Sequence, residues 1–308
     1  MVFRRLLVCA SAILFSLSPG YPQSVPSPDI KPLPDLKSFL QDIRQHLHTD
    51  STLQSQYTFT EKLIRRQMDS KGNVKNTESM VYEVYPPTDE YPVYRKTILI
   101  NDIPPGDEQI SKAEESHRER QKKWQDRQRQ PAEESPNRKQ RREAKEKEAR
   151  QKEQETADEL FNLFEIKMIG REQMEGISVI GLTFEPRRDY KPKTDDGKTM
   201  SKVHGTAWVS EDDKELVHLD VELKDNIKFG LGIIAKLNKG THLTFKRRKL
   251  NDEIWLPAYS SIVGTGRILI FKGFQINQEA IYSDYRKFSV ETEYQISLPE
   301  KNISQDIH

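Results

Sequence analysis

The chain has almost no cysteine and almost no net charge. Cys9 is its only cysteine among 308 residues, and the formal net charge is +1. Cys9 lies in an apolar run that we interpret below as a signal peptide, so we expect a mature protein without a disulfide or a thiol nucleophile. Near-neutral charge argues against a general nucleic-acid binder, which needs a basic surface.

Long apolar runs and catalytic motifs are also missing. Beyond the first residues, no stretch of about 18 apolar residues occurs, the length that a membrane helix needs. The sequence contains no Gly-x-Ser-x-Gly, no phosphate-binding Walker loop and no His-Glu-x-x-His. These absences remove the motif-based arguments for an enzyme. We expect a non-catalytic protein with no cofactor and no resident metal.

The first residues have the organisation of a secretory signal. Arg4 and Arg5 precede an apolar run over residues 6–17, and small residues follow. This run is too short to span a bilayer but fits a signal-peptide core. We therefore predict a signal peptide over residues 1–20, cleaved after Gly20 or less favourably after Ser24, and export to the periplasm.

A proline-rich linker and an amphipathic helix follow the predicted signal. Residues 21–34 are rich in proline and small polar residues, which is typical of an extended linker. Residues 35–48 place apolar side chains at helical spacing, so one stripe of the helix must be buried. These side chains are Leu36, Phe39, Leu40, Ile43 and Leu47.

Most of the remaining chain alternates between apolar and polar residues. Residues 57–67, 77–85 and 91–100 predict an antiparallel meander, because turn signals and prolines separate them. Residues 191–198 predict a polar loop. Further strands are predicted after residue 160, over 161–169, 176–186, 203–210, 216–223, 241–250, 253–262, 267–271 and 285–297.

These elements predict an α+β, mainly antiparallel β fold. About nine to eleven strands in sequential hairpins would form one curved sheet or incomplete β-barrel, with the helix covering its concave side. We expect a single domain over residues 35–298 and a flexible tail over residues 299–308.

A highly charged segment interrupts the strands at residues 107–159. Both signs of charge are interspersed and apolar residues are few. Helix-favouring runs flank Pro131 and Pro136, which predicts two helices with a break between them. The segment is interpreted as a solvated helical insertion; the alternative is an arm that binds a partner.

Several local motifs resemble the periplasmic outer-membrane lipoprotein-sorting proteins. In chain order they are residues 205–210 (GTAWVS), 239–241 (KGT), 255–257 (WLP) and 282–288 (YSDYRKF). The chain is similar to this family over roughly residues 160–296, and more weakly over residues 35–100. The resemblance implies an incomplete β-barrel whose helices cover an apolar cavity for acyl chains.

The apolar faces of the strands are the candidate ligand-binding surface. Alternating apolar residues either line a cavity, since larger barrels enclose ligands, or simply fill a core. The candidates for a cavity lining are Val217, Leu219, Val221, Leu243, Phe245, Trp255, Phe288, Val290 and Tyr294.

The glycine-containing segment of residues 226–240 is a candidate lid. It is longer than a hairpin turn and rich in apolar residues, so it could be a mobile lid or a membrane-touching loop; the alternative is a short packed helix. The lid candidates are Phe229, Leu231, Ile233 and Ile234.

Three histidines raise the question of a metal. His204, His218 and His242 lie on three predicted strands and would point to the polar side. A metal site would require these strands to be neighbours in register. We interpret the three as solvated strand residues.

Together these observations predict a carrier or sensor of lipids or acylated lipoproteins, with transient membrane contact and no nucleic-acid partner. The alternative is a periplasmic interaction or envelope-sensing scaffold that binds envelope proteins through the charged insertion.

Overall fold

The computed structural model describes residues 31–46, 56–69, 71–87, 92–129, 161–229, 235–268 and 272–287, with isolated positions between 140 and 159. The chain divides into two compact units, Met1–Leu33 and Pro34–His308. Nearly all the described residues belong to the second unit, and the elements below all lie in it.

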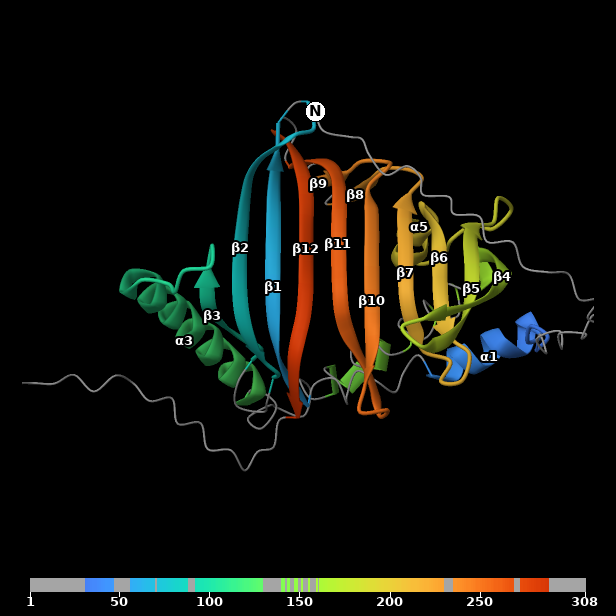
Figure 1. The fold of residues 1–308 in the computed structure, drawn as a ribbon, viewed down its shortest axis with the longest axis horizontal. Helices are drawn as coiled ribbons and strands as arrows, with labels where there is room; N and C mark the ends of the chain where they lie inside the picture. Colours follow the sequence, from blue (N-terminus) through green and yellow to red (C-terminus); the bar gives the residue numbers. More distant parts are fainter. Residues whose placement is uncertain are drawn as a thin grey trace, which may run out of the picture. The chain divides into compact units, whose positions relative to one another are not determined.

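A single antiparallel sheet makes up most of this unit (Figure 1). Along the sheet the strands follow the order β3-β2-β1-β12-β11-β10-β7-β6-β5-β4, while β9 pairs with β11 and with β8. Within the described chain, β3 and β4 are the two ends and do not pair, so the sheet does not close. The prediction of a mainly antiparallel β fold is confirmed. The strands are β1 (Tyr57–Met68), β2 (Val74–Tyr85), β3 (Tyr94–Ile100), β4 (Phe164–Met174), β5 (Ile177–Pro186), β6 (Val203–Ser210), β7 (Leu216–Leu223), β8 (Ile227–Phe229), β9 (Ala235–Leu237), β10 (His242–Leu250), β11 (Ile254–Ile268) and β12 (Lys272–Lys287).

The predicted N-terminal helix forms and packs on the sheet. It is α1 (Leu36–His46), and the Asp35 side chain caps its start by accepting a hydrogen bond from the Ser38 N–H at 2.9 Å. Phe39 is 1% exposed and packs in one cluster with Ile180, Leu182 and Val209 of β5 and β6. Burial of the apolar stripe therefore holds α1 against these strands.

Several segments differ from the sequence-based expectations. The predicted polar loop at 191–198 contains the start of a short helix, α5 (Asp195–Met200), because Thr194 caps it through the Gly197 N–H at 2.8 Å. The predicted lid carries the hairpin of β8 and β9, so the alternative of a short helix is wrong. The break expected between strands at 253–262 and 267–271 is absent, since Gly264 and Gly266 continue the ladder of β11 with β12 up to Ile268; residues 269–271 lie outside the described residues.

The charged segment contains one long described helix, α3 (Asp107–Arg129), and helical positions recur between residues 140 and 163. Pro131, Pro136 and the predicted break lie outside the described residues. α3 contacts the sheet through His117, whose ring centroid lies 4.0 Å from that of Tyr94 on β3. The predicted start of the last strand is wrong: β12 begins at Lys272, well before residue 285, and the predicted strand after Lys287 lies outside the described residues.

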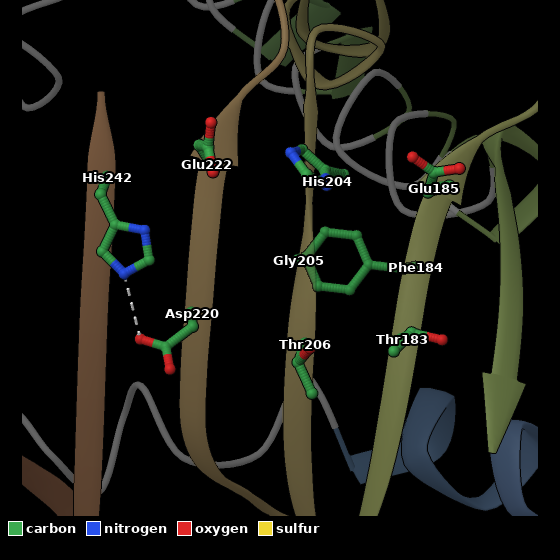
Figure 2. Close-up of a pocket in the computed structure, with 9 residues that line it drawn as sticks. All are labelled: Thr183, Phe184, Glu185, His204, Gly205, Thr206, Asp220, Glu222 and His242. Atoms are coloured by element: carbon green, nitrogen blue, oxygen red, sulfur yellow. Dashed lines mark ion pairs between the residues drawn. The ribbon is translucent and has the colours of Figure 1, made fainter. Parts of the chain in front are cut away.

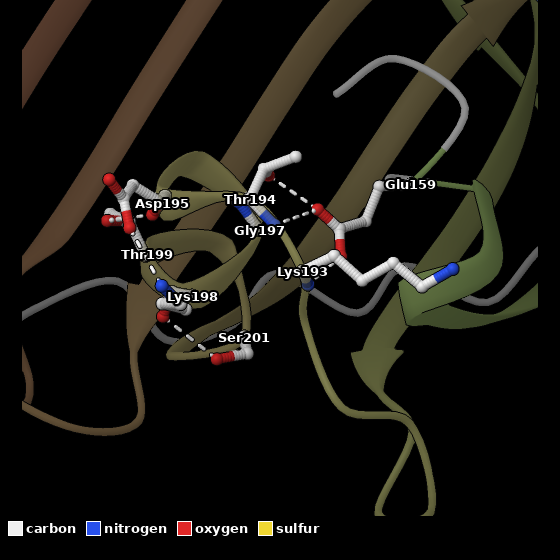
Figure 3. Close-up of polar contacts among 8 residues, drawn as sticks. All are labelled: Glu159, Lys193, Thr194, Asp195, Gly197, Lys198, Thr199 and Ser201. Atoms are coloured by element: carbon white, nitrogen blue, oxygen red, sulfur yellow. Dashed lines mark hydrogen bonds and ion pairs between the residues drawn. The ribbon is translucent and has the colours of Figure 1, made fainter. Parts of the chain in front are cut away.

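A buried carboxylate ties the end of the charged segment to α5 (Figure 3). Glu159 is 4% exposed, and its carboxylate accepts hydrogen bonds from the backbone N–H groups of Lys193 and Thr194, the Thr194 hydroxyl and the Tyr190 hydroxyl. Burial raises the pKa of Glu159, but the hydrogen bonds from Thr194 and Lys193 outweigh it and hold the pKa below its ordinary value.

We expect Phe39→Ala to lower the free energy of unfolding by about 3–5 kcal/mol, because it removes a fully buried ring between α1 and the sheet. Urea denaturation followed by circular dichroism measures this. Ile110→Ala on α3 is the control, since Ile110 is 41% exposed. Equal urea midpoints for the two variants would contradict the packing of α1.

We expect Glu159→Gln to lower the free energy of unfolding by about 1.5–3 kcal/mol at pH 7, through loss of hydrogen bonds to a charged group. A lowered folded-state pKa stabilises the fold above the unfolded-state pKa, and this contribution disappears as the pH falls through the folded-state pKa. The difference between parent and variant should therefore shrink below about pH 4. Glu165→Gln, on an exposed carboxylate, is the control; a pH-independent difference for Glu159→Gln would refute the assignment.

Candidate functional site

One face of the sheet carries a continuous transverse row of apolar side chains. The strands are paired in register, so side chains opposite one another point to the same face. Following the pairing from β3 to β4 gives one residue per strand, and serine is the single polar member. We call these residues the apolar row and this side of the sheet the apolar face. The row is Ile100, Met80, Leu63, Ala280, Ser260, Phe245, Leu219, Ala207, Leu182 and Met168.

Burial varies along the apolar row. Leu182 and Met168, at the β5–β4 end, contact the cluster that α1 covers. Leu63 and Ala280 are also buried, whereas Phe245, Leu219 and Met80 are only half-buried. The middle of the apolar face therefore combines apolar side chains with residual exposure.

Four of the predicted cavity residues lie together on this face. Leu219 pairs with Phe245, and Val221 pairs with Leu243, on the neighbouring strands β7 and β10. All four are half-buried. Their assignment to a cavity stays a prediction, because shared placement on one face does not by itself make a cavity.

The other predicted cavity residues lie elsewhere. Val217 is the extra residue where the β6–β7 register shifts, and it packs with Val179 and Trp255 in a separate buried cluster. The candidates outside the described residues are Phe288, Val290, Tyr294, Leu231, Ile233 and Ile234; Phe229 ends β8, with no side chain described.

The opposite face carries a groove of about 340 Å³ whose lining is mostly polar (Figure 2). Its lining comes from β5, β6, β7 and β10, and several side chains stand side by side because their strands pair in register. The lining residues are Thr183, Phe184, Glu185, His204, Gly205, Thr206, Asp220, Glu222 and His242.

Asp220 is the centre of this polar surface. Its Oδ1 accepts a hydrogen bond from the Thr244 hydroxyl at 2.7 Å, and its carboxylate lies 3.2 Å from His218 Nε2 and 3.5 Å from His242 Nε2. Burial raises the pKa of Asp220, but the Thr244 hydrogen bond and the two imidazoles outweigh it and lower the pKa. These contacts join β7 to β10.

The three histidines lie on one face of the sheet, as predicted. His204 and His242 both line the groove, whereas His218 is not among its lining residues. His204 is opposite Glu222, while His218 stacks on Trp208 with ring centroids 4.6 Å apart. Among the described residues, no group of three or more His, Cys, Asp or Glu side chains is arranged to hold a metal ion.

Sequence reasoning missed an ion pair on the apolar face that involves a buried carboxylate. Glu61 of β1 is 3% exposed and lies 2.9 Å from the Arg95 guanidinium of β3. The signal was available in the sequence, since Glu61 stands two positions from both Phe59 and Leu63 and a strand places all three on one face. The partner on β3 could not be found that way.

Comparison with known proteins gives likenesses of structure but none of sequence. No family model and no curated protein matches the chain. An outer membrane lipoprotein-sorting protein domain from Vibrio parahaemolyticus has a similar structure, with 12% identity, a TM-score of 0.30, and coverage of 85% of this chain and 93% of that one. This structure bears the name of the family that the sequence motifs resemble.

Two further solved structures are similar at the same low level. A DUF1329 family protein from Desulfovibrio piger has 12% identity and a TM-score of 0.26, over 83% of this chain and 94% of that one. The MucA/MucB complex of Pseudomonas aeruginosa contains a chain with 8% identity and a TM-score of 0.20, over 82% and 98%. Likenesses at this level say nothing about ligand or activity.

No helix in the part of the chain that the structure describes combines the length and apolarity needed to cross a bilayer.

We expect a double-mutant cycle between Asp220→Asn and Thr244→Val to give a coupling of about 1–2 kcal/mol in the free energy of unfolding, because the pair shares a hydrogen bond to a charged group. The matched control is the cycle with Thr206→Val. Thr206 stands opposite Asp220 on the other neighbouring strand and has no hydrogen bond to it. Equal coupling in the two cycles would refute the specific role of Thr244.

Proposed function

We propose that the protein is a periplasmic carrier or binding module for lipids or the acyl chains of lipoproteins, and that it performs no chemistry on them. The observation that supports this most directly is the apolar row, which crosses every strand from β3 to β4 on one face. The half-buried side chains in its middle, such as Phe245 and Leu219, offer apolar surface for a ligand.

Burial of an acyl chain supplies enough free energy for this role. Each CH₂ group removed from water contributes about 0.8 kcal/mol, so a long chain binds tightly without a specific polar contact. A row of aliphatic and aromatic side chains suits such a ligand, because it discriminates by length and polarity more than by detailed shape. Release would then require a partner or a rearrangement of the face.

The compartment follows from the predicted signal peptide. Residues 4–20 have the charged, apolar and small-residue regions of a secretory signal. In an aqueous compartment between two membranes a free acyl chain would be exposed to water, so its transfer requires a carrier. The resemblance of the motifs to periplasmic lipoprotein-sorting proteins also supports a periplasmic location.

One observation favours the alternative of an interaction or envelope-sensing module. α3 is 23 residues long, and most of its described side chains are exposed. A helix with this much exposed charged surface is accessible to a partner protein. The two functions are compatible, since a loaded carrier must also be recognised.

We expect Leu219→Asp to abolish co-purification of lipid, because it places a carboxylate in the middle of the apolar row. Native mass spectrometry of the protein purified from a bacterial periplasm, followed by lipid extraction, measures the loss. Titration with a fluorescent fatty acid gives a second readout.

Ile281→Asp is the matched control for this experiment. Ile281 is 40% exposed, and it is one position from Ala280 of the apolar row, so it points to the opposite face. This variant should retain the lipid. A ligand-free mass for the parent protein, with no uptake of the fluorescent probe, would refute the carrier and leave the interaction module.

A further inference from the structure

An arginine stands on the apolar face. Arg95 of β3 lies opposite Val84 of β2, and its guanidinium carbon is 5.9 Å from the centre of the Tyr82 ring. Its Nη2 donates a hydrogen bond to Glu61 Oε1 at 3.1 Å. Glu61 is two positions from Leu63 in the same strand, so this pair shares the face of the apolar row.

The burial of the two partners is unequal. The Glu61 side chain is 4% exposed, whereas the Arg95 side chain is 54% exposed. Burial raises the pKa of Glu61 above its ordinary value, although the Arg95 charge opposes this. A buried carboxylate costs stability unless it is paired, so Glu61 acts as a positioning residue that keeps the guanidinium in place.

Within the described part of the chain, the Arg95 guanidinium leaves most of its N–H donors unused. Arginine carries five N–H donors, and among the described residues Arg95 has only Glu61 as a hydrogen-bond or ion-pair partner. Tyr82 and Val84 of β2 lie beside Arg95, and hydrogen bonds from a charged donor are stronger than those between neutral groups. The planar arrangement of the guanidinium donors fits the two oxygens of a carboxylate or a phosphate.

Aromatic side chains lie next to Glu61 on the apolar face. Tyr282 is opposite Glu61, and the Phe59 ring lies 5.9 Å from Tyr282 and 5.3 Å from Tyr285. These rings extend the apolar face from Leu63 toward Arg95. An acyl chain on the face would thus meet a positive charge at this end.

We propose that Arg95 binds the anionic head group, a carboxylate or a phosphate, of an acyl-chain ligand that lies on the apolar face. This assignment rests on the proposed function, because it specifies the polar end of the same ligand. It makes the protein selective for anionic amphiphiles over neutral ones with the same chain.

The test compares ligands that differ only in their head group. A fluorescent sixteen-carbon fatty acid and its methyl ester are titrated into the full mature chain, and hexadecyl phosphate and hexadecanol are then used as competitors. We expect the parent to bind the acid about ten- to hundredfold more tightly than the ester. Arg95→Met should remove this preference and leave the affinity for the ester unchanged.

Two further variants control for structural damage. Arg286→Met removes an arginine that is also paired with one carboxylate, at 3.0 Å from Glu83, and is 66% exposed; Glu83 points away from the face of Tyr82. It should keep the preference. Glu61→Gln combined with Arg95→Met avoids an unpaired buried carboxylate and should behave as Arg95→Met does.

The outcomes separate this inference from the proposed function. The head-group site is refuted if the parent binds acid and ester equally, or if the preference for the acid survives in Arg95→Met. Neither result contradicts the proposed carrier function. Failure of both ligands to bind overturns both. Stronger competition by hexadecyl phosphate than by hexadecanol supports a phosphate head group, whereas selectivity for the fatty acid alone supports a carboxylate.

Discussion

The antiparallel pairing of β1 with β12 joins the two parts of the sheet. Thr58 and the carbonyl of Arg286 share a hydrogen bond across 228 positions of sequence. Without this pairing the meander of β1 to β3 would have no neighbour, and the apolar row would end at Ala280. The entropy of closing so long a loop grows only slowly with length, so the ladder can offset it. Such non-local pairing is expected to form slowly during folding.

The register of the paired strands determines which side chains lie on each face of the sheet. Each strand alternates its side chains, and aligned strands add their apolar members into one row and their polar members into another. Leu219 and Asp220 are neighbours in sequence but belong to opposite faces. A slip of one residue would exchange them, which would bury Asp220 and expose Leu219. Hydrogen bonds such as that of Asp220 with Thr244 help to hold the register.

Two buried carboxylates, Glu159 and Glu61, interrupt the apolar packing of the protein. Glu159 is satisfied by backbone and hydroxyl donors, which suits a structural joint between the charged segment and α5. Glu61 is paired instead with a half-exposed arginine, which leaves donors available on the apolar face. A buried carboxylate needs partners in both places. At Glu159 these partners stabilise a connection, whereas at Glu61 the partner is the proposed binding group.

The sequence by itself determined the elements whose signal is local. Alternation and helical spacing identified α1 and most strands, and placed Leu219, Val221, Leu243 and Phe245 on one face. Tertiary structure decided the adjacency of β1 and β12, the bulge that turns Val217 toward Trp255, the β8–β9 hairpin, and the meeting of Glu61 with Arg95. The periodicity of a strand fixes where its own side chains point, whereas its partner and register depend on contacts between residues far apart in the chain.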